Sequence, residues 1–319
     1  MDFLPLLVCV LINQTTSTRS SLKIGFYATS CPTAESLIQK ATQTKWNVDK
    51  TITAGILRMF FHDCFVQGCD ASNLIVSTPT NKAELDALPN LTLHGMDLIE
   101  TAKAAVEEAC PGIVSCADII ALATRDVVVI AGGSTYEVPT GRRDSRVSLA
   151  SSVNIPGPTM SVASAASAFQ GRGLTLQDMV TLLGAHTVGV AHCEFFFNRL
   201  YNYSGTGQQD PSMAPSLASS LKSVCGPQLN GLGNTVALDE GTEFVFDTSY
   251  YQQLKQNHGV MQIDQELTQD PTTSALVTSF AGQSTLFDSR FAQAIVKMGN
   301  IGVLTGSQGE IRRICSKIN

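Results

Sequence analysis

Cysteine is the residue whose distribution most constrains this fold. Nine cysteines occur in the 319 residues, and only Cys9 lies in the apolar N-terminal segment. The remaining even set predicts four disulfides if the protein folds in an oxidising compartment, but eight cysteines allow on the order of 100 pairings. Spacing favours a pair only for Cys64 and Cys69, which could close a tight loop. The eight are Cys31, Cys64, Cys69, Cys110, Cys116, Cys193, Cys225 and Cys315.

The N-terminus indicates an exported protein. Its apolar core runs from Phe3 to Ile12, and polar and small residues follow it. This core falls well short of the roughly 20 residues that span a bilayer, so it favours a secretory signal over a short membrane anchor. We expect the signal to cover residues 1–20, with cleavage near Ser20, although the usual N-terminal positive charge is missing. The mature chain should be soluble, with no membrane partner.

Composition limits the kinds of partner. With 44% hydrophobic residues the chain can bury a large core, and we expect residues 21–319 to form one folded unit that could divide into two lobes. The formal net charge is −6 and the sequence pI is about 5.4, with no basic run that could neutralise phosphates. This argues against a nucleic-acid partner and favours a small neutral or mildly charged ligand.

Apolar residues recur mostly with helical spacing. Clear i, i+3, i+4, i+7 patterns begin at Ala34 and at Leu98. Capping boxes precede two further apolar segments, at Ser115 with Asp118 and at Thr175 with Asp178. Because few segments alternate with period two, we expect a mainly α fold with minor, short β elements.

Arg58, Phe61 and His62 form the first candidate site. In a helix over residues 52–64, Arg58 and His62 are four apart and share one face. A guanidinium beside an imidazole lowers the histidine pKa, because adjacent positive charges repel. The pair therefore suits a neutral base next to a stabiliser of negative charge. A histidine at a helix end making ordinary hydrogen bonds is the alternative.

The loop after His62 is rich in potential metal ligands. It offers carboxylates, a hydroxyl and backbone carbonyls, which are the oxygen donors that Ca²⁺ prefers. Zinc is the alternative, because His62, Cys64 and Cys69 lie close together; yet no second paired cluster follows, and export favours a disulfide between the cysteines. The oxygen donors are Asp63, Val66, Gly68, Asp70 and Ser72.

His186 ends an apolar stripe that begins at Met179. It suits either an ordinary core histidine or the protein ligand of a haem iron, whose properties are tuned by the partner of its second nitrogen. Thr187 follows directly, and a second oxygen-rich set with the chemistry of a hard-cation site lies further along the chain. That set comprises Asp239, Thr242, Val245 and Asp247.

Seven segments together resemble one family. In chain order they read LRMFFHDCFVQGCDAS, VPTGRRDS, NIPGPT, LLGAHTVGVAHC, FDTSYY, MGNIGVLTG and IRRIC. They fall in the order and at the intervals of the secreted plant haem peroxidases, the class III family. The resemblance spans nearly all of residues 22–319 and includes all eight cysteines of the mature chain.

The resemblance implies the haem-peroxidase fold, with two helical lobes sandwiching one haem b. His62 is similar to the family's distal base and Arg58 to its distal arginine, with Phe61 beside them. His186 resembles the proximal ligand of the haem iron. Four further residues are also implied: Asn90, which holds the distal histidine; Glu84, as a supporting carboxylate; Asp270, as the partner of His186; and Pro156, in the access channel for aromatic donors.

The resemblance further implies two calcium ions and four disulfides. The distal calcium ligands correspond to Asp63, Val66, Gly68, Asp70 and Ser72. The proximal ones correspond to Thr187, Asp239, Thr242, Val245 and Asp247. The implied disulfides are Cys31–Cys110, Cys64–Cys69, Cys116–Cys315 and Cys193–Cys225.

By resemblance, the function is a peroxidase that reduces hydrogen peroxide to water while oxidising small phenolic donors in one-electron steps. His62 would move a proton between the peroxide oxygens, and Arg58 would stabilise the separating charge. We expect a secreted monomer in the plant cell wall space, with a glycan on Asn202 in the sequon Asn-Tyr-Ser. A haem- and calcium-binding wall protein without turnover and a zinc hydrolase are the alternatives.

Three residues depart from the family pattern. Asn73 stands where an aliphatic residue is common, His94 replaces an arginine, and Glu194 stands where some members carry a basic residue near the haem edge. None of them removes a catalytic group, so we expect them to affect donor range rather than activity.

Overall fold

The computed structural model describes residues 22–229 and 231–319. The predicted signal peptide, residues 1–20, and its Cys9 lie outside the described residues. Among the helices that are described, none is both long enough and apolar enough to cross a membrane.

Helices make up nearly all of the regular structure, which confirms the mainly α prediction. The described α-helices are α1 (Ala34–Val48), α2 (Ile52–Val66), α3 (Met96–Ala109), α4 (Cys116–Ile130), α5 (Val162–Gly171), α6 (Leu176–Leu183), α7 (Phe197–Tyr201), α8 (Pro215–Cys225), α9 (Ser249–Lys255), α10 (Gln262–Gln269), α11 (Ser274–Gly282) and α12 (Ser284–Met298). Short 3₁₀ helices include η1 (Ser72–Leu74), η2 (Glu84–Asp86), η3 (Leu88–Asn90) and η5 (Gly184–Thr187). One antiparallel pair, β1 (Val190–His192) and β2 (Thr235–Ala237), places Val190 opposite Ala237.

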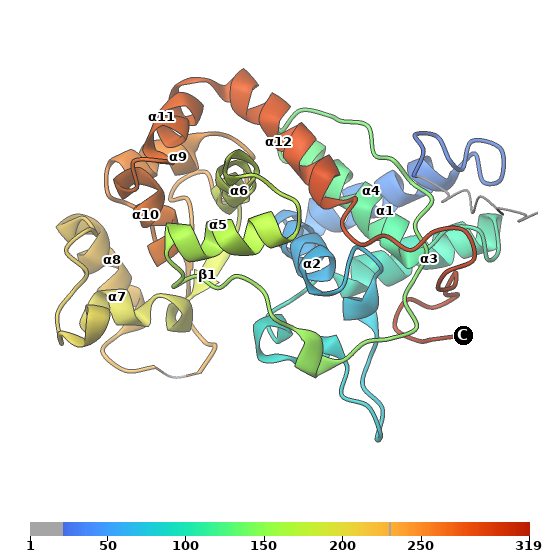
Figure 1. Ribbon diagram of the computed structural model, residues 1–319, viewed down its shortest axis with the longest axis horizontal. Helices are drawn as coiled ribbons and strands as arrows, with labels where there is room; N and C mark the ends of the chain where they lie inside the picture. The colour runs from blue at the N-terminus through green and yellow to red at the C-terminus, as the bar shows by residue number, and fades with distance from the viewer. Residues whose placement is uncertain (1–21, 230) are drawn as a thin grey trace, which may run out of the picture.

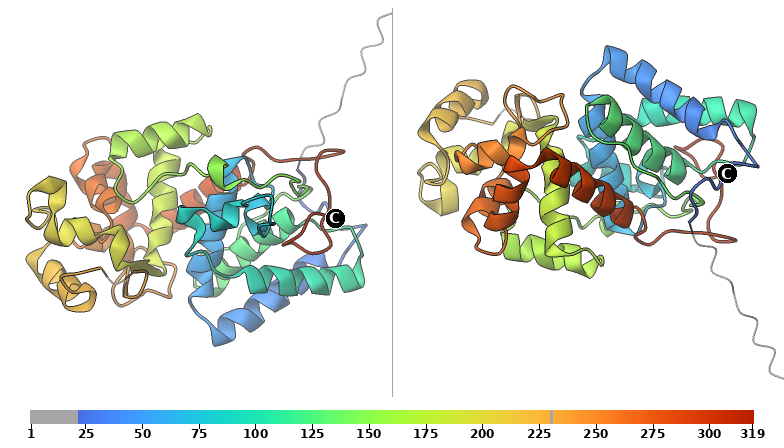
Figure 2. Two further views of the ribbon diagram at one scale, coloured as in Figure 1. Left: turned by 90° about the horizontal axis from the view of Figure 1, so that it is seen from below. Right: turned by 90° about the horizontal axis from the view of Figure 1, so that it is seen from above.

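The helices form two groups with α2 near their boundary (Figure 1). One group contains α1, α3 and α4 together with the C-terminal segment, and the other contains α7 to α11. Helix α12 starts beside α11, packs against α6 and runs towards the first group, as the two further views also show (Figure 2). Helix α2 packs against α4 on one side and against η5 on the other.

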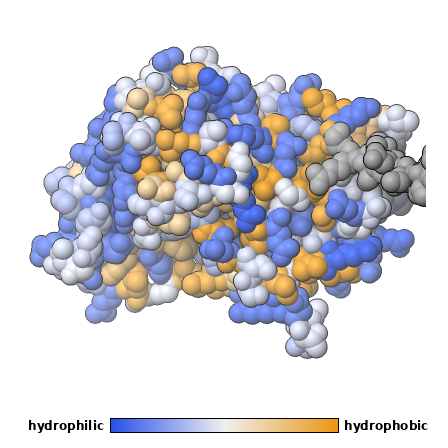
Figure 3. All heavy atoms as spheres, in the orientation of Figure 1, coloured by the Kyte–Doolittle hydropathy of each residue, from blue (hydrophilic) through white to orange (hydrophobic). Residues whose placement is uncertain are grey.

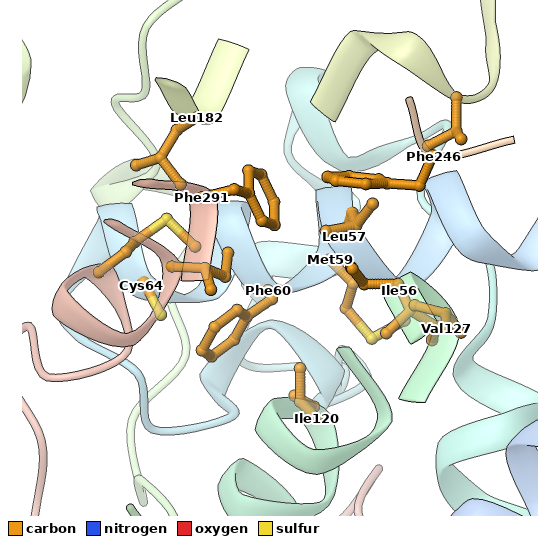
Figure 4. Close-up of a cluster of buried hydrophobic side chains, with 14 of the residues drawn as sticks. Ile56, Leu57, Met59, Phe60, Cys64, Ile120, Val127, Leu182, Phe246 and Phe291 are labelled. Carbon is orange, nitrogen blue, oxygen red and sulfur yellow. The ribbon is translucent and has the colours of Figure 1, made fainter. Parts of the chain in front are cut away.

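Helix α2 is buried on nearly every side. Its sequence, ITAGILRMFFHDCFV, is apolar around most of the helix, which is typical of a helix inside a core rather than on a surface. Figure 4 shows Met59 and Phe60 facing Ile120 and Val127 of α4 within one connected cluster of buried apolar side chains. On the side of the molecular surface that Figure 3 shows, by contrast, hydrophilic and hydrophobic residues are interspersed. The core therefore fixes the helix that carries Arg58 and His62.

Only one of the two predicted capping boxes forms completely. At Thr175 and Asp178, each side chain accepts from the backbone N–H of the other residue. At Ser115, the hydroxyl accepts from the Asp118 N–H, but the Asp118 carboxylate turns away from the cap. It accepts from the Tyr27 hydroxyl at 2.7 Å and from Arg142 Nη1 at 2.8 Å instead. The helix start predicted there is correct, but the Asp118 carboxylate contacts distant residues and does not cap the helix.

Four disulfides tie the helices together, in the pairs that the resemblance implies. They are Cys31–Cys110, Cys64–Cys69, Cys116–Cys315 and Cys193–Cys225. The third pair spans 199 residues and holds the C-terminal segment against the start of α4.

Candidate functional site

His62 lies near the end of α2 and is 4% exposed. Its Nδ1 donates to Oδ1 of Asn90 at 2.6 Å, and Nδ2 of Asn90 donates to the backbone carbonyl of Glu84 at 2.7 Å. This chain places the proton of a neutral imidazole on Nδ1, so the other nitrogen, Nε2, carries the free lone pair. Asn90 also begins the sequon Asn90-Leu91-Thr92, but it is 1% exposed and so not open to glycosylation.

The implied role of the Glu84 carboxylate is not what the structure shows. The backbone carbonyl of Glu84 holds Asn90, whereas both carboxylate oxygens are buried without a hydrogen-bond partner among the described residues. Burial raises the pKa of Glu84 to about 7. The support for Asn90 therefore comes from the fold of η2 and not from the acid.

Arg58 is held by the same segment that holds His62. Its Nη1 donates to the Thr92 hydroxyl at 2.8 Å and its Nη2 to the Pro89 carbonyl at 2.7 Å. Burial lowers the pKa of Arg58 to about 10, which leaves it cationic at neutral pH. Burial, and then the charge of Arg58, lower the pKa of His62 to about 3. The imidazole is therefore neutral at physiological pH, in the direction that the sequence predicts.

Phe61 is half-buried beside this pair. Its ring centroid is 5.6 Å from that of His62 and 4.4 Å from that of Phe65. Phe169 of α5 packs against Phe65, with 4.7 Å between the ring centroids, so an aromatic cluster from two helices supports the Phe61 ring.

His186 lies in η5, after α6 has ended at Leu183. Its Nδ1 is 2.9 Å from Oδ1 and 3.1 Å from Oδ2 of Asp264, a carboxylate that is 1% exposed. The Tyr250 hydroxyl donates to the same Oδ1 at 2.9 Å. Burial alone lowers the pKa of His186, but the charge and hydrogen bond of Asp264 outweigh it and raise the pKa overall.

The predicted partner of His186, Asp270, is wrong. Asp270 lies at the C-terminal end of α10, is half-buried, and accepts from the Thr272 N–H at 2.8 Å. Asp264 lies six residues earlier in the same helix, on its buried face between Ile263 and Leu267. A signal for this exists in the sequence, because Asp270 precedes a proline at which a helix would end, whereas Asp264 falls within the apolar periodicity.

The residues of the predicted first calcium site lie around one buried loop. Oδ1 of Asp63 and Oγ of Ser72 are buried without a hydrogen-bond partner among the described residues, and such orphaned oxygens fit a hard cation. Burial, and then the charge of Asp70, raise the pKa of Asp63. Gly68 has a φ of +147°, and a side chain there would collide with the backbone of Gly302.

The zinc alternative is contradicted at the same loop. Cys64 and Cys69 are bonded to each other, so neither is a free thiolate. No group of three or more His, Cys, Asp or Glu side chains suited to a metal occurs in the described part of the chain. The calcium set differs from such a group because it relies also on hydroxyls and carbonyls.

The second oxygen-rich set gathers directly after His186. The Thr187 hydroxyl donates to Oδ2 of Asp239 at 2.8 Å and lies 3.1 Å from Oδ1 of Asp247. The Thr242 hydroxyl is buried without a partner among the described residues. Burial raises the pKa of Asp239. Val245, the remaining predicted ligand, is 45% exposed.

Pro156 and Asn202 lie at the surface. Pro156 is half-buried, and Asn202 is exposed with its carboxamide oxygen accepting from the Gly207 N–H at 2.8 Å. Near Asn90, Leu88 is 81% exposed and Leu91 is 54% exposed. These two apolar side chains belong to the segment that holds Arg58 and His62.

The three departures from the family pattern occupy different environments. Asn73 is buried, and its Nδ2 donates to the Met59 carbonyl inside α2 at 2.9 Å. His94 packs its ring against Gly55, also in α2, where any side chain on the glycine would collide. Both oxygens of the Glu194 carboxylate are buried without a partner among the described residues.

The two histidines have the features that a haem site requires. Helix α2 and η5 pack together, and the charge of Arg58 acts on the pKa of both imidazoles. Each histidine uses Nδ1 for its protein partner. Within residues 22–229 and 231–319, neither Nε2 forms a hydrogen bond, so one is available to bind an iron and the other to accept a proton.

The sequence matches known proteins over nearly all of its length. A family model described as "Peroxidase" matches residues 36–283. Peroxidase 57 of Arabidopsis thaliana is 47% identical over 300 residues, covering 94% of this chain and 93% of the relative. Peroxidase 71 of the same plant is 48% identical, covering 94% and 90%. Peroxidase 5 of Vitis vinifera is 45% identical over 315 residues, covering 98% and 96%.

Proposed function

Because this chain belongs to the class III plant peroxidases and is a haem- and calcium-binding peroxidase, we propose that one haem b binds between His62 and His186. The observation that carries this proposal is the pair of imidazoles in opposite surroundings, one beside Arg58 and one bonded to Asp264. His186 would be the axial ligand of the iron, and His62 would face the peroxide.

When bound, a haem would supply an iron that can bind hydrogen peroxide and, together with its porphyrin ring, the two electrons that cleavage of the O–O bond requires. Nε2 of His62 accepts the proton of the bound peroxide oxygen and delivers it to the departing one, which leaves as water. Asn90 keeps the Nδ1 proton in place during both transfers. Arg58 stabilises the negative charge that develops on the departing oxygen.

Asp264 supports the reaction from the other side. Its carboxylate accepts a hydrogen bond from Nδ1–H of His186, which makes Nε2 a stronger electron donor to the iron. Two molecules of a phenolic donor would then each supply one electron and one proton, so one peroxide and two donors give two waters and two donor radicals. We place the donor approach near Pro156, which is half-buried at the surface.

We further propose two calcium ions, one beside each histidine. Asp63 follows His62 directly and Thr187 follows His186 directly, so each ion would brace the backbone of one histidine. The distal ligands are Asp63, Val66, Gly68, Asp70 and Ser72, and the proximal ones are Thr187, Asp239, Thr242, Val245 and Asp247. The protein would act as a secreted monomer in the plant cell wall, glycosylated on Asn202.

The visible spectrum and metal content of the purified protein test this function, together with an assay of guaiacol oxidation by hydrogen peroxide. We expect a Soret band, one iron and two calcium ions per chain, and turnover that depends on peroxide. A Soret band without donor oxidation would instead support a haem- and calcium-binding wall protein. Bound zinc without a Soret band would contradict the haem site altogether.

A further inference from the structure

Tyr250 is a buried residue that makes a specific contact behind His186. Its side chain comes from α9 and is 2% exposed. Its hydroxyl donates to Oδ1 of Asp264 at 2.9 Å, and its ring lies edge-on to His186 with 6.1 Å between the ring centroids. A chain of three residues, Tyr250, Asp264 and His186, is therefore linked by hydrogen bonds.

We propose that Tyr250 is a positioning residue that limits how strongly Asp264 pulls on the proton of His186, and so sets the electron donation from this histidine to the haem iron. The inference rests on the proposed role of His186 as axial ligand. It goes further, because it gives a residue outside the iron ligands a defined effect on the redox properties of the haem.

The direction of the effect follows from the shared acceptor. Oδ1 of Asp264 accepts from both His186 and Tyr250, at 2.9 Å each. A donor that shares a carboxylate oxygen withdraws charge from it, which weakens the bond from the other donor. Without the Tyr250 hydroxyl, Asp264 would attract the Nδ1 proton more strongly. His186 would then donate more electron density and favour the ferric state.

The neighbouring Tyr251 provides a matched control. It is also fully buried in α9, but its hydroxyl donates to the Val180 carbonyl at 2.9 Å and not to Asp264. Tyr251→Phe removes the same hydroxyl from the same helix. It tests the loss of a buried hydrogen bond without changing the contact to the carboxylate.

The experiment compares haem-loaded Tyr250→Phe, Tyr251→Phe and the unchanged protein. The readouts are the ferric/ferrous reduction potential and the iron–histidine stretching frequency in the ferrous state. In Tyr250→Phe we expect a more negative potential. The equilibrium constant for reduction should fall about threefold to tenfold, as for the loss of a hydrogen bond to a charged group. The stretching frequency should rise. Tyr251→Phe should match the unchanged protein in both.

A second variant guards against a folding defect in Tyr250→Phe. A fluorinated tyrosine placed at position 250 keeps the ring and is a stronger hydrogen-bond donor, so both readouts should move in the opposite direction. The inference is wrong if Tyr250→Phe equals the unchanged protein, if it shifts like Tyr251→Phe, or if the fluorinated variant shifts in the same direction as Tyr250→Phe. Absence of any iron–histidine band from the unchanged protein would instead contradict His186 as the ligand.

Discussion

His62 and His186 share a side chain and differ in everything that surrounds it. His62 donates to a neutral amide and lies beside a cation, and its pKa falls to about 3. His186 donates to a buried carboxylate, and its pKa is raised. The first stays neutral and can take up a proton from a substrate. The second has an electron-rich ring suited to an iron. The partner at Nδ1 and the nearest charge thus decide what each histidine does.

The local frameworks of the two histidines differ as well. His62 lies on a regular α-helix inside the core, and one surface segment, residues 84–92, holds both it and Arg58. His186 lies in a 3₁₀ turn after α6 and is held from α10 through Asp264. Gly184 precedes it in that turn, where any side chain would collide with Tyr251 and Phe287. The surroundings of each histidine should therefore respond to different substitutions.

The largest expected effect comes from removing the base alone. His62→Ala should slow the reaction with hydrogen peroxide by at least ~10²-fold, as is typical for the loss of a general acid–base group. The haem should remain bound, because His186 and Asp264 are untouched. Stopped-flow mixing with peroxide measures the rate, and the haem spectrum is the control. An unchanged rate would show that His62 is not the base.

Removing the cation should weaken the contrast between the histidines. Arg58→Leu should slow the peroxide reaction by about 10²-fold, through the loss of charge stabilisation. The positive charge of Arg58 disfavours imidazolium and lowers the pKa of His62, so its removal raises that pKa. Neutral His62 is the active form, so the acidic limb of the rate profile should move to higher pH, by about one pKa unit or more.

The control for this prediction is Arg58→Lys, which retains the positive charge and should keep the acidic limb near its original pH. The measurement is the bimolecular rate with peroxide as a function of pH. If Arg58→Leu left the limb in place, the low pKa of His62 would have to come from burial alone.

The corresponding substitution beside His186 removes the charge of the carboxylate of Asp264. Asp264→Asn removes the negative charge that His186 faces, so His186 should donate less to the iron and the reduction potential should become more positive. We expect the peroxide reaction to slow by about tenfold. Asp270→Asn is the matched control, because Asp270 accepts hydrogen bonds from Thr272 and not from His186. Equal effects of the two substitutions would contradict the assignment of Asp264.

The distal residues could be predicted because their relations are local. Arg58 and His62 are four residues apart in one helix, so periodicity alone places them on one face. The choice between Asp264 and Asp270 depends on where α10 ends and which of its faces is buried. The proline after Asp270 and the apolar positions around Asp264 indicate both features, but the contact between Asp264 and His186, 78 positions apart, is made only by tertiary packing. The hydrogen bond from Tyr250 to Asp264 could not be predicted, because two adjacent tyrosines indicate only that the segment is buried.

Two further predictions were wrong, for different physical reasons. Glu84 supports Asn90 through a backbone carbonyl, a group that every residue has, so residue type could not reveal it. The Asp118 carboxylate was predicted to close a capping box, but it bonds to Tyr27, which lies 91 positions away. Local patterns therefore located the helices and their starts, whereas the partners of buried acids were fixed by tertiary contacts.

Calcium removal tests whether each histidine depends on its own ion. Exhaustive EDTA treatment should lower activity severalfold and alter the haem spectrum while the protein stays folded, because the four disulfides and the core remain. Ser72→Ala and Thr242→Ala each remove one orphaned hydroxyl, so each should weaken one ion only. Metal analysis and the haem spectrum measure the outcome. If EDTA changed neither the metal content nor the spectrum, the calcium sites would be misassigned.

The smallest expected effect concerns Asn73, which donates a hydrogen bond to the helix that carries His62. Its Nδ2 donates to the Met59 carbonyl, but its Oδ1 is buried without a partner among the described residues. Asn73→Leu removes one hydrogen bond and one orphaned oxygen at similar volume, so the two effects should nearly cancel, within about 1 kcal/mol. Asn73→Ala leaves a cavity as well and should cost about 1–3 kcal/mol. Denaturant unfolding with intact disulfides measures both. Equal losses for the two variants would mean that the amide contact itself holds α2 in place, and the peroxide rate of Asn73→Leu should then fall together with its stability.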